Sequence, residues 1–149
     1  MILDASVAAK WFLPDEPFLH EARAVRTAVL AEVVDLAAPA TLWTEISNAI
    51  VRAVRRGRVD PELARQFAEQ MVGLTLVELV LIDARDTIDT ALRLGLNAYD
   101  AQYLALGSRL ARTVITADRR MFEVGRASGY DVAWLGDVRP EGRRLAYTP

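Results

Sequence analysis

Short apolar segments alternate with longer segments of helical periodicity along almost the whole sequence, and the loops between them are short. A chain that runs strand, helix, strand with short connections builds a parallel sheet covered by helices. The sequence therefore predicts a three-layer α/β/α sandwich around a short, mainly parallel central sheet. The expected strands are residues 1–3, 35–38, 76–82, 113–115 and 132–135, and the expected helices are 5–13, 19–34, 41–56, 60–72, 83–94, 97–111 and 118–127.

The chain has 149 residues, which is the usual size of one domain. Its 52% of hydrophobic and 26% of charged residues are ordinary for a globular protein with its own core. We expect one domain over residues 1–138. The polar, proline-flanked segment 139–149 is expected to be a mobile tail.

The composition excludes several kinds of chemistry. The chain has no Cys, and its single His is His20, so thiolate zinc sites, Cys nucleophiles and His clusters are ruled out. The formal net charge of -2 argues against a simple nucleic-acid-binding module. No apolar run approaches the roughly 18 residues needed to span a membrane, and residues 1–3 already read as a strand without a charged leader. We therefore expect a cytoplasmic protein without membrane contacts.

Four acidic residues occupy equivalent places in this pattern. Asp4 and Asp118 follow expected strands, and Glu45 and Asp100 lie in the first turns of expected helices. In a parallel sheet, the carboxyl ends of strands and the starts of the following helices face one edge, where ligands bind. We therefore expect the four carboxylates to converge on one cleft.

Carboxylates that share a pocket repel one another, and bound cations relieve this repulsion. A site made of oxygen ligands alone suits Mg²⁺ or Mn²⁺, ions that support phosphodiester hydrolysis. Ser6 and Thr116 each lie two residues from an acidic position, where a hydroxyl can orient a carboxylate or a bound water.

Four stretches of the sequence resemble the motifs of VapC-type toxins, which are PIN-domain ribonucleases. They are MILDASV at 1–7 followed by KWF at 10–12, PATLWTEISNA at 39–49, YDAQYLAL at 99–106 and TADRR at 116–120. Each motif alone is a weak signal. Their order and spacing fit the family up to about Leu135, and no acidic ligand is missing.

The resemblance implies a PIN fold over residues 1–138, dependence on Mg²⁺ or Mn²⁺, and cleavage of cellular RNA. It also implies a homodimer and inhibition by a cognate VapB-type antitoxin. By residue, the resemblance makes Asp4, Glu45 and Asp100 the core metal ligands and Asp118 a fourth catalytic acid. It makes Ser6, Asn48 and Thr116 supporting polar residues.

The acidic residues can also be interpreted as structural, namely as helix caps. Asp4, Asp118 and the pair Asn97 and Asp100 have the positions of helix caps, whereas Glu45 has no capping partner at Leu42. Two further functional readings depend on charge. Lys10 either faces the cleft or covers its own helix, and we favour the surface. A run of Arg52, Arg55, Arg56 and Arg58 either contacts RNA or is a solvated helix end.

Aromatic residues have their own structural readings. Tyr99 and Tyr103 are expected to pack inside. Core positions are also expected for Trp11, Phe12, Leu13 and Phe18, although these could instead line a groove for an antitoxin helix.

Two other functions compete with the ribonuclease. A phosphatase of the haloacid-dehalogenase type would use Asp4 as a nucleophile, but that class needs an acid where Ser6 stands and a Lys downstream of Lys10. A non-catalytic module that keeps the PIN fold without its metal is the third possibility, and the four retained acids argue against it.

Overall fold

A five-stranded, fully parallel sheet forms the centre of the molecule, which confirms the α/β sandwich. The computed structural model describes residues 1–72, 76–141 and 144–146. The strands of the sheet lie in the order β3-β2-β1-β4-β5. They are β1 (Ile2–Leu3), β2 (Leu36–Pro39), β3 (Val77–Val80), β4 (Val114–Thr116) and β5 (Val132–Trp134).

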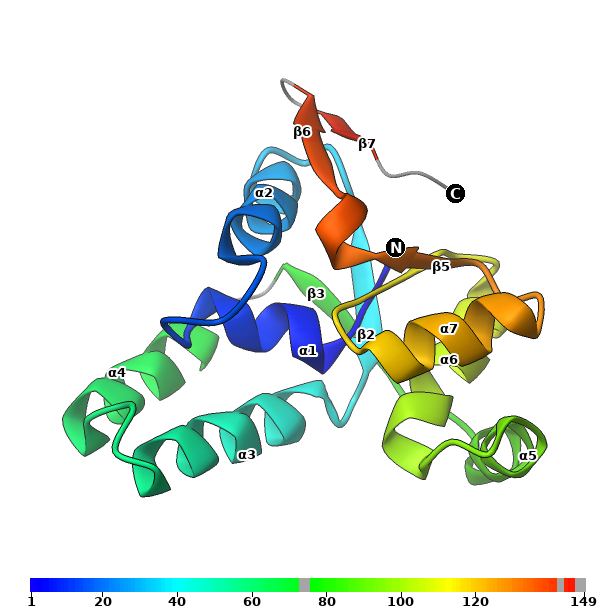
Figure 1. Ribbon diagram of the computed structural model, residues 1–149, viewed down its shortest axis with the longest axis horizontal. Coiled ribbons are helices and arrows are strands. Elements are labelled where there is room, and N and C mark those ends of the chain that lie inside the picture. Colours follow the sequence, from blue (N-terminus) through cyan, green and yellow to red (C-terminus); the bar gives the residue numbers. More distant parts are fainter. Residues whose placement is uncertain (73–75, 142–143, 147–149) are drawn as a thin grey trace.

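Helices cover both faces of this sheet. In Figure 1, α1 to α4 lie on the left of the strands and α5 to α7 on the right. The helices are α1 (Ala5–Ala8), the 3-10 turn η1 (Ala9–Trp11), α2 (Leu19–Leu30), α3 (Leu42–Arg55), α4 (Pro61–Val72), α5 (Ala84–Leu94), α6 (Ala98–Leu110), α7 (Arg119–Ala127) and the 3-10 turn η2 (Leu135–Asp137). Within the described residues, none of these helices is long and apolar enough to cross a membrane.

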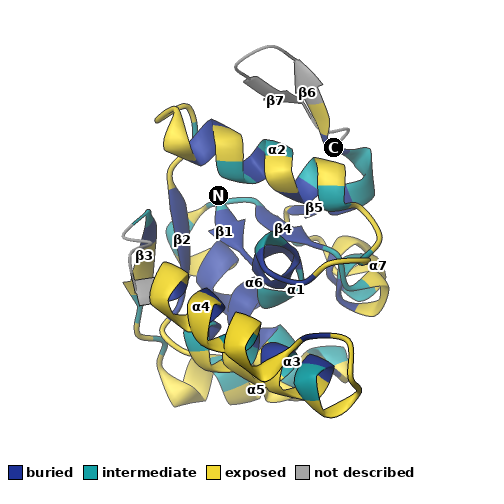
Figure 2. Ribbon diagram, turned by 90° about the vertical axis from the view of Figure 1, so that its left-hand side faces the viewer, coloured by how far each residue is buried: buried dark blue, intermediate teal, exposed yellow. Residues whose placement is uncertain are grey.

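The core lies between the sheet and the inner faces of the helices. Ile2, Leu3 and Ile115 in adjacent strands are fully buried. Figure 2 shows the same arrangement, with buried strands at the centre and exposed residues on the outer faces of the helices. Helix α6 is buried along most of its length, and α3 buries one face at helical spacing through Leu42, Ile46 and Ile50.

Several expected boundaries are corrected by the structure. The expected helix 5–13 is a short α-helix followed by a 3-10 turn, because Pro14 disfavours helical geometry at the residue before it. Helix α2 ends at Leu30 rather than near residue 34, since Glu32 adopts a left-handed conformation with φ 56°. The strand expected to be fully buried at 76–82 is instead the edge strand β3, and its Glu78 and Leu79 are exposed. The expected end of α4 at Gly73 lies outside the described residues.

The C-terminal segment contains regular structure that the sequence pattern did not predict. Strands β6 (Arg139–Glu141) and β7 (Arg144–Ala146) form a separate antiparallel pair, and both lie against α2. Antiparallel backbone pairing, which does not depend on apolar side chains, lets so polar a segment form strands. Its mobility stays a prediction.

Gly107 lets helix α6 approach strand β4 closely. A Cβ atom at this position would lie 2.6 Å from Cγ2 of Val114 and 3.0 Å from the carbonyl oxygen of Arg112. Gly107→Ala should therefore lower the free energy of unfolding by about 1–2 kcal/mol, because overpacking outweighs the gain in helix propensity. Urea denaturation measures this change. The neighbouring exposed Ser108→Ala is the control, and equal stability of the two variants would contradict the close approach.

Candidate active site

The candidate site lies at the carboxyl ends of β1 and β4, where the order of the strands reverses. Strand β1 is followed along the chain by β2 on one side of it, whereas β4 pairs with its other side. Asp4 comes directly after β1, and Asp118 follows β4. Such a reversal leaves a crevice between the diverging connections, which is the usual ligand site of a parallel sheet.

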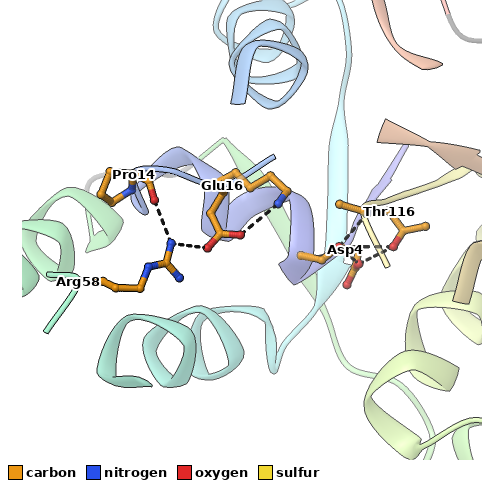
Figure 3. A network of polar contacts seen from close by, with 8 residues as sticks. Asp4, Pro14, Glu16, Arg58 and Thr116 are labelled. Atoms are coloured by element: carbon orange, nitrogen blue, oxygen red, sulfur yellow. Dashed lines mark hydrogen bonds and ion pairs between the residues drawn. The ribbon is translucent and has the colours of Figure 1, made fainter. Parts of the chain in front are cut away.

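Asp4 is buried, with 6% of its surface exposed. Its Oδ2 accepts hydrogen bonds from the hydroxyls of Ser6 and of Thr116, the latter at 2.7 Å, and Figure 3 shows the contact with Thr116. Burial raises the pKa of Asp4, and the charge of Asp118 also raises it, while the two hydroxyl donors lower it. Asp4 is the N-cap residue of α1, but its side chain makes no capping hydrogen bond there.

The two hydroxyls that hold Asp4 also fix the turn after β4. Ser6 accepts a hydrogen bond from the backbone N–H of Ala117 at 2.9 Å. Thr116 accepts one from the N–H of Asp118 at 2.8 Å. Each hydroxyl therefore donates to the Asp4 carboxylate and accepts from the loop that carries Asp118, which sets the two acids relative to each other.

Glu45 lies at the start of α3 and is held from two helices. Its Oε1 accepts hydrogen bonds from Thr41 at 2.8 Å and from Gln102 and Tyr103 of α6, both at 3.0 Å. Burial is the main cause that raises the pKa of Glu45. The donors Thr41 and Tyr103 lower it, and the charges of Asp4 and Asp100 raise it further. Glu45 is thus coupled to both acids, and the reading as a freely solvated residue is wrong.

The sequence did not predict that Thr41, Gln102 and Tyr103 donate hydrogen bonds to Glu45. Thr41 is the N-cap residue of α3, but its side chain makes no capping bond there. Tyr103 was expected to be a packing residue, and it is indeed 1% exposed, yet its hydroxyl reaches Glu45. The available signal was spacing, since Tyr103 follows Asp100 by three residues and so shares its helix face.

Asp100, in the first turn of α6, is affected by the charges of Asp118 and Asp4. Burial raises its pKa to about 6, together with the charges of Asp118 and Asp4, while the Asn97 amide and Arg120 lower it. The Asn97 amide donates to Oδ2 of Asp100 at 2.7 Å, and the Asn97 Oδ1 accepts from the Asp100 backbone N–H at 2.9 Å. The expected capping arrangement is therefore present, and it coexists with coupling to the other acids.

Asp118 also has a structural role. Its Oδ1 accepts a hydrogen bond from the N–H of Met121 at 2.8 Å and so caps α7. The capping reading is confirmed here, and the charge of Asp118 still raises the pKa values of Asp4 and Asp100.

Asn48 lies apart from the hydroxyls around Asp4. It is exposed and lines a cavity of about 480 Å³ together with Thr44, Glu45, Arg52 and Tyr99. Tyr99 is 61% exposed, so the expectation that it packs inside is wrong. Tyr99 lies in the first turn of α6 and faces this cavity.

Lys10 is buried, with 8% exposure, which contradicts the surface reading. It lines a second cavity with Ser6 and Asp118, and this cavity is also lined by Arg52, Arg56 and Arg58. Of the four expected core aromatic and aliphatic residues near it, Phe12 and Leu13 are buried and Trp11 is partly buried. Phe18 is 36% exposed and packs edge-on against Trp134.

The structure places the acids near enough to influence one another electrostatically: Asp118 acts on Asp4 and Asp100, and both Asp4 and Asp100 act on Glu45. Each of Asp4, Glu45 and Asp100 has its pKa raised by burial and by at least one other acid of the set. Within the part of the chain that is described, no three acidic or His side chains are assembled into a ready metal-binding group. A divalent cation would relieve the repulsion, and carboxylates are ligands that Mg²⁺ and Mn²⁺ prefer.

Comparison with known proteins finds similar sequences and folds. One curated relative is Ribonuclease VapC3 of Pyrobaculum aerophilum, which is 29% identical over 126 residues, covering 83% of this chain and 92% of that protein.

Solved structures share the fold. PAE2754 from Pyrobaculum aerophilum has a TM-score of 0.67 and 20% identity, with 91% of this chain and 88% of that chain covered. FitAcB from Neisseria gonorrhoeae has a TM-score of 0.60 and 18% identity, covering 89% and 94%. A toxin-antitoxin complex from Klebsiella pneumoniae has a TM-score of 0.56 and 17% identity, covering 81% and 88%.

Family membership follows from the sequence itself. Residues 1–127, which include every acidic residue of the candidate site, match the family described as PIN domain. The match removes the alternative of a haloacid-dehalogenase-type phosphatase. The chain therefore belongs to the PIN-domain family.

Proposed function

We propose that this protein is a metal-dependent ribonuclease that hydrolyses phosphodiester bonds in cellular RNA. The observation that carries the proposal is the electrostatic coupling of acids from separate elements: the charge of Asp4 raises the pKa values of Glu45 and Asp100, and the charge of Asp118 raises those of Asp4 and Asp100. A fold gains nothing in stability from such repulsion, so its retention points to a cation and a reaction. Membership of the PIN family and the relative named Ribonuclease VapC3 support the choice of RNA.

The residues present fit Mg²⁺ or Mn²⁺ by their chemistry. The donors are carboxylate oxygens alone, since the chain has no Cys and its one His lies in α2. Mg²⁺ is commonly held by one or two carboxylates together with water and substrate phosphate, which suits a site whose acids are coupled but not closely assembled. We propose Asp4, Glu45 and Asp100 as ligands, with Asp118 as the fourth acid.

When bound, such an ion supplies an activated water and neutralises the charge that develops on the phosphoryl oxygens. The side chains of this protein hold the ligands in place for that chemistry. Ser6 and Thr116 keep the Asp4 carboxylate oriented, and Gln102 and Tyr103 do the same for Glu45. By the family resemblance, the products would carry a 5′-phosphate and a 3′-hydroxyl.

The biological setting is a further part of the proposal. We infer a toxin of the VapC type that acts in the cytoplasm and is neutralised by a VapB-type antitoxin. Support comes from the name of the relative and from the structural likeness to a toxin-antitoxin complex. We also propose a homodimer. Leu81 follows β3, and Ile88 and Leu92 lie in α5; all three are exposed apolar side chains that a second copy would bury. Light scattering of the purified chain decides the mass in solution.

Purified protein should cleave mixed RNA with Mn²⁺ or Mg²⁺ and should stop when EDTA is added. Asp4→Asn should lower the cleavage rate at least about a hundredfold, because a ligand is lost while the hydrogen bonds from Ser6 and Thr116 are kept. Gel analysis of labelled RNA with mapping of the new ends measures both effects. Asp89→Asn, on the exposed side of α5, is the matched control. A wild-type chain that cleaves nothing with either metal would favour a non-catalytic PIN-fold module.

Without metal, the charge of Asp100 should destabilise the fold at neutral pH. Its pKa rises from 3.8 to about 6 on folding, so the folded state binds this proton more tightly than the unfolded state. The stabilising contribution is therefore complete below pH 3.8 and is lost as the pH rises through about 6. Asp100→Asn should stabilise the protein in EDTA at pH 7.5 by about 1 kcal/mol, a value reduced because the group is half-buried.

Thermal unfolding in EDTA at pH 4 and pH 7.5 measures this effect. At pH 4 the advantage of Asp100→Asn should shrink, and Mn²⁺ at pH 7.5 should stabilise the wild type more than the variant. Asp89→Asn is again the control. An equal advantage at both pH values would show that the repulsion is not the cause.

A further inference from the structure

A basic cavity adjoins the acidic site. Its volume is about 360 Å³, and it shares Ser6 and Asp118 with the site just described. The rest of its polar lining is dominated by the cations Lys10, Arg52, Arg56 and Arg58, with Glu16 as the one other acid among its lining residues. An acidic site repels a polyanion, so cations next to it are where an RNA backbone can approach.

Lys10 is the least expected member of this lining. It is the only lysine of the chain, it lies in η1, and it is 8% exposed. Its Nζ lies 3.6 Å from Oε2 of Glu16, which is an ion pair longer than a hydrogen bond. A buried ammonium group is costly without a close anion, so this cation is poised for a better partner than Glu16 provides.

Glu16 holds two cations at once from a loop. Its Oε1 accepts a hydrogen bond from Nη2 of Arg58 at 2.8 Å, and the same Nη2 donates to the carbonyl oxygen of Pro14 at 3.2 Å. Figure 3 shows this network beside the Asp4 and Thr116 pair. The Glu16 side chain is 25% exposed and that of Arg58 is 39% exposed, so solvent and ligands reach the pair.

We propose that this cavity binds a backbone phosphate of the RNA strand near the bond that is cut, and that Glu16 is the resident anion that this phosphate displaces. Lys10 and Arg58 are the partners of the phosphate. A phosphodiester carries the same charge as the Glu16 carboxylate and can accept from the same two cations, with Arg offering the planar donor pair that suits phosphate. The inference rests on the proposed function, because it assumes RNA as the substrate.

Two consequences separate this role from a purely structural ion pair. Removing the Glu16 charge should tighten RNA binding, since the phosphate no longer competes with a carboxylate. Removing the charge of Arg58 or Lys10 should weaken binding. If the ion pair were purely structural, all three substitutions would change the stability of the fold. Their effect on RNA affinity would then equal that of the same charge changes made far from the cavity.

The test is the binding of a fluorescein-labelled, mixed-sequence single-stranded RNA in EDTA, followed by anisotropy. Glu16→Gln should tighten binding about threefold, and Arg58→Gln and Lys10→Met should weaken it about tenfold. For the two cation variants the slope of log K against log salt should fall by about 0.7. Because Lys10 is buried, circular dichroism first checks that Lys10→Met folds. If Lys10→Met does not fold, the Glu16→Gln and Arg58→Gln variants carry the test, because neither side chain is buried.

Matched surface changes serve as controls for net charge. Glu123→Gln and Arg126→Gln change the charge by the same amounts on α7, away from this cavity. The inference is overturned if Glu16→Gln binds RNA no tighter than Glu123→Gln, or if Arg58→Gln binds no weaker than Arg126→Gln. Since binding is measured without metal, this result is independent of cleavage. If the variants bind RNA in the expected pattern but the wild type never cleaves it, the proposed ribonuclease function is contradicted and the phosphate site is still supported.

Discussion

The buried carboxylate of Asp4 is the constraint on which the rest of the site depends. It is removed from solvent at the end of β1, and its ionised form is supported by two hydroxyls, from Ser6 and Thr116. Those same hydroxyls accept from the backbone after β4, so the acid also joins two strands that are neighbours in the sheet but distant in sequence. The hydrogen bonds around Asp4 thereby set its position relative to Asp118, and a bound cation would relieve the repulsion between these acids.

The parallel sheet explains why acids and cations lie so close together. Connections diverge at the reversal between β1 and β4, and the cavity beside it is lined by Ser6 and Asp118 together with residues of η1, the following loop and α3. The acids suit a divalent cation, and the Lys and Arg side chains of this cavity suit a polyanion. The overall charge of -2 conceals this division, because the surface that would meet RNA is a local one.

Much of this arrangement could be predicted from the pattern of the sequence. Alternating strands and helices predicted the sandwich, and the positions of the acids after strands or in first helical turns predicted their common edge. The order of the strands in the sheet could not be predicted, because hydrophobic periodicity does not say which strand lies at an edge. The exposure of the edge strand β3 was therefore not predicted. The Tyr103 hydroxyl on Glu45, the exposed ring of Tyr99 and the burial of Lys10 all depend on how helices meet across the fold. Local secondary-structure propensity does not determine such tertiary contacts.

The central claim is that side chains from separate elements share one divalent ion. Anomalous diffraction from crystals soaked in Mn²⁺ tests it without reference to any activity. We expect a manganese peak within coordination distance, about 2.0–2.4 Å, of carboxylate oxygens from at least two of Asp4, Glu45 and Asp100. Manganese bound only elsewhere on the molecule, with these carboxylates left without it, would contradict a shared ion.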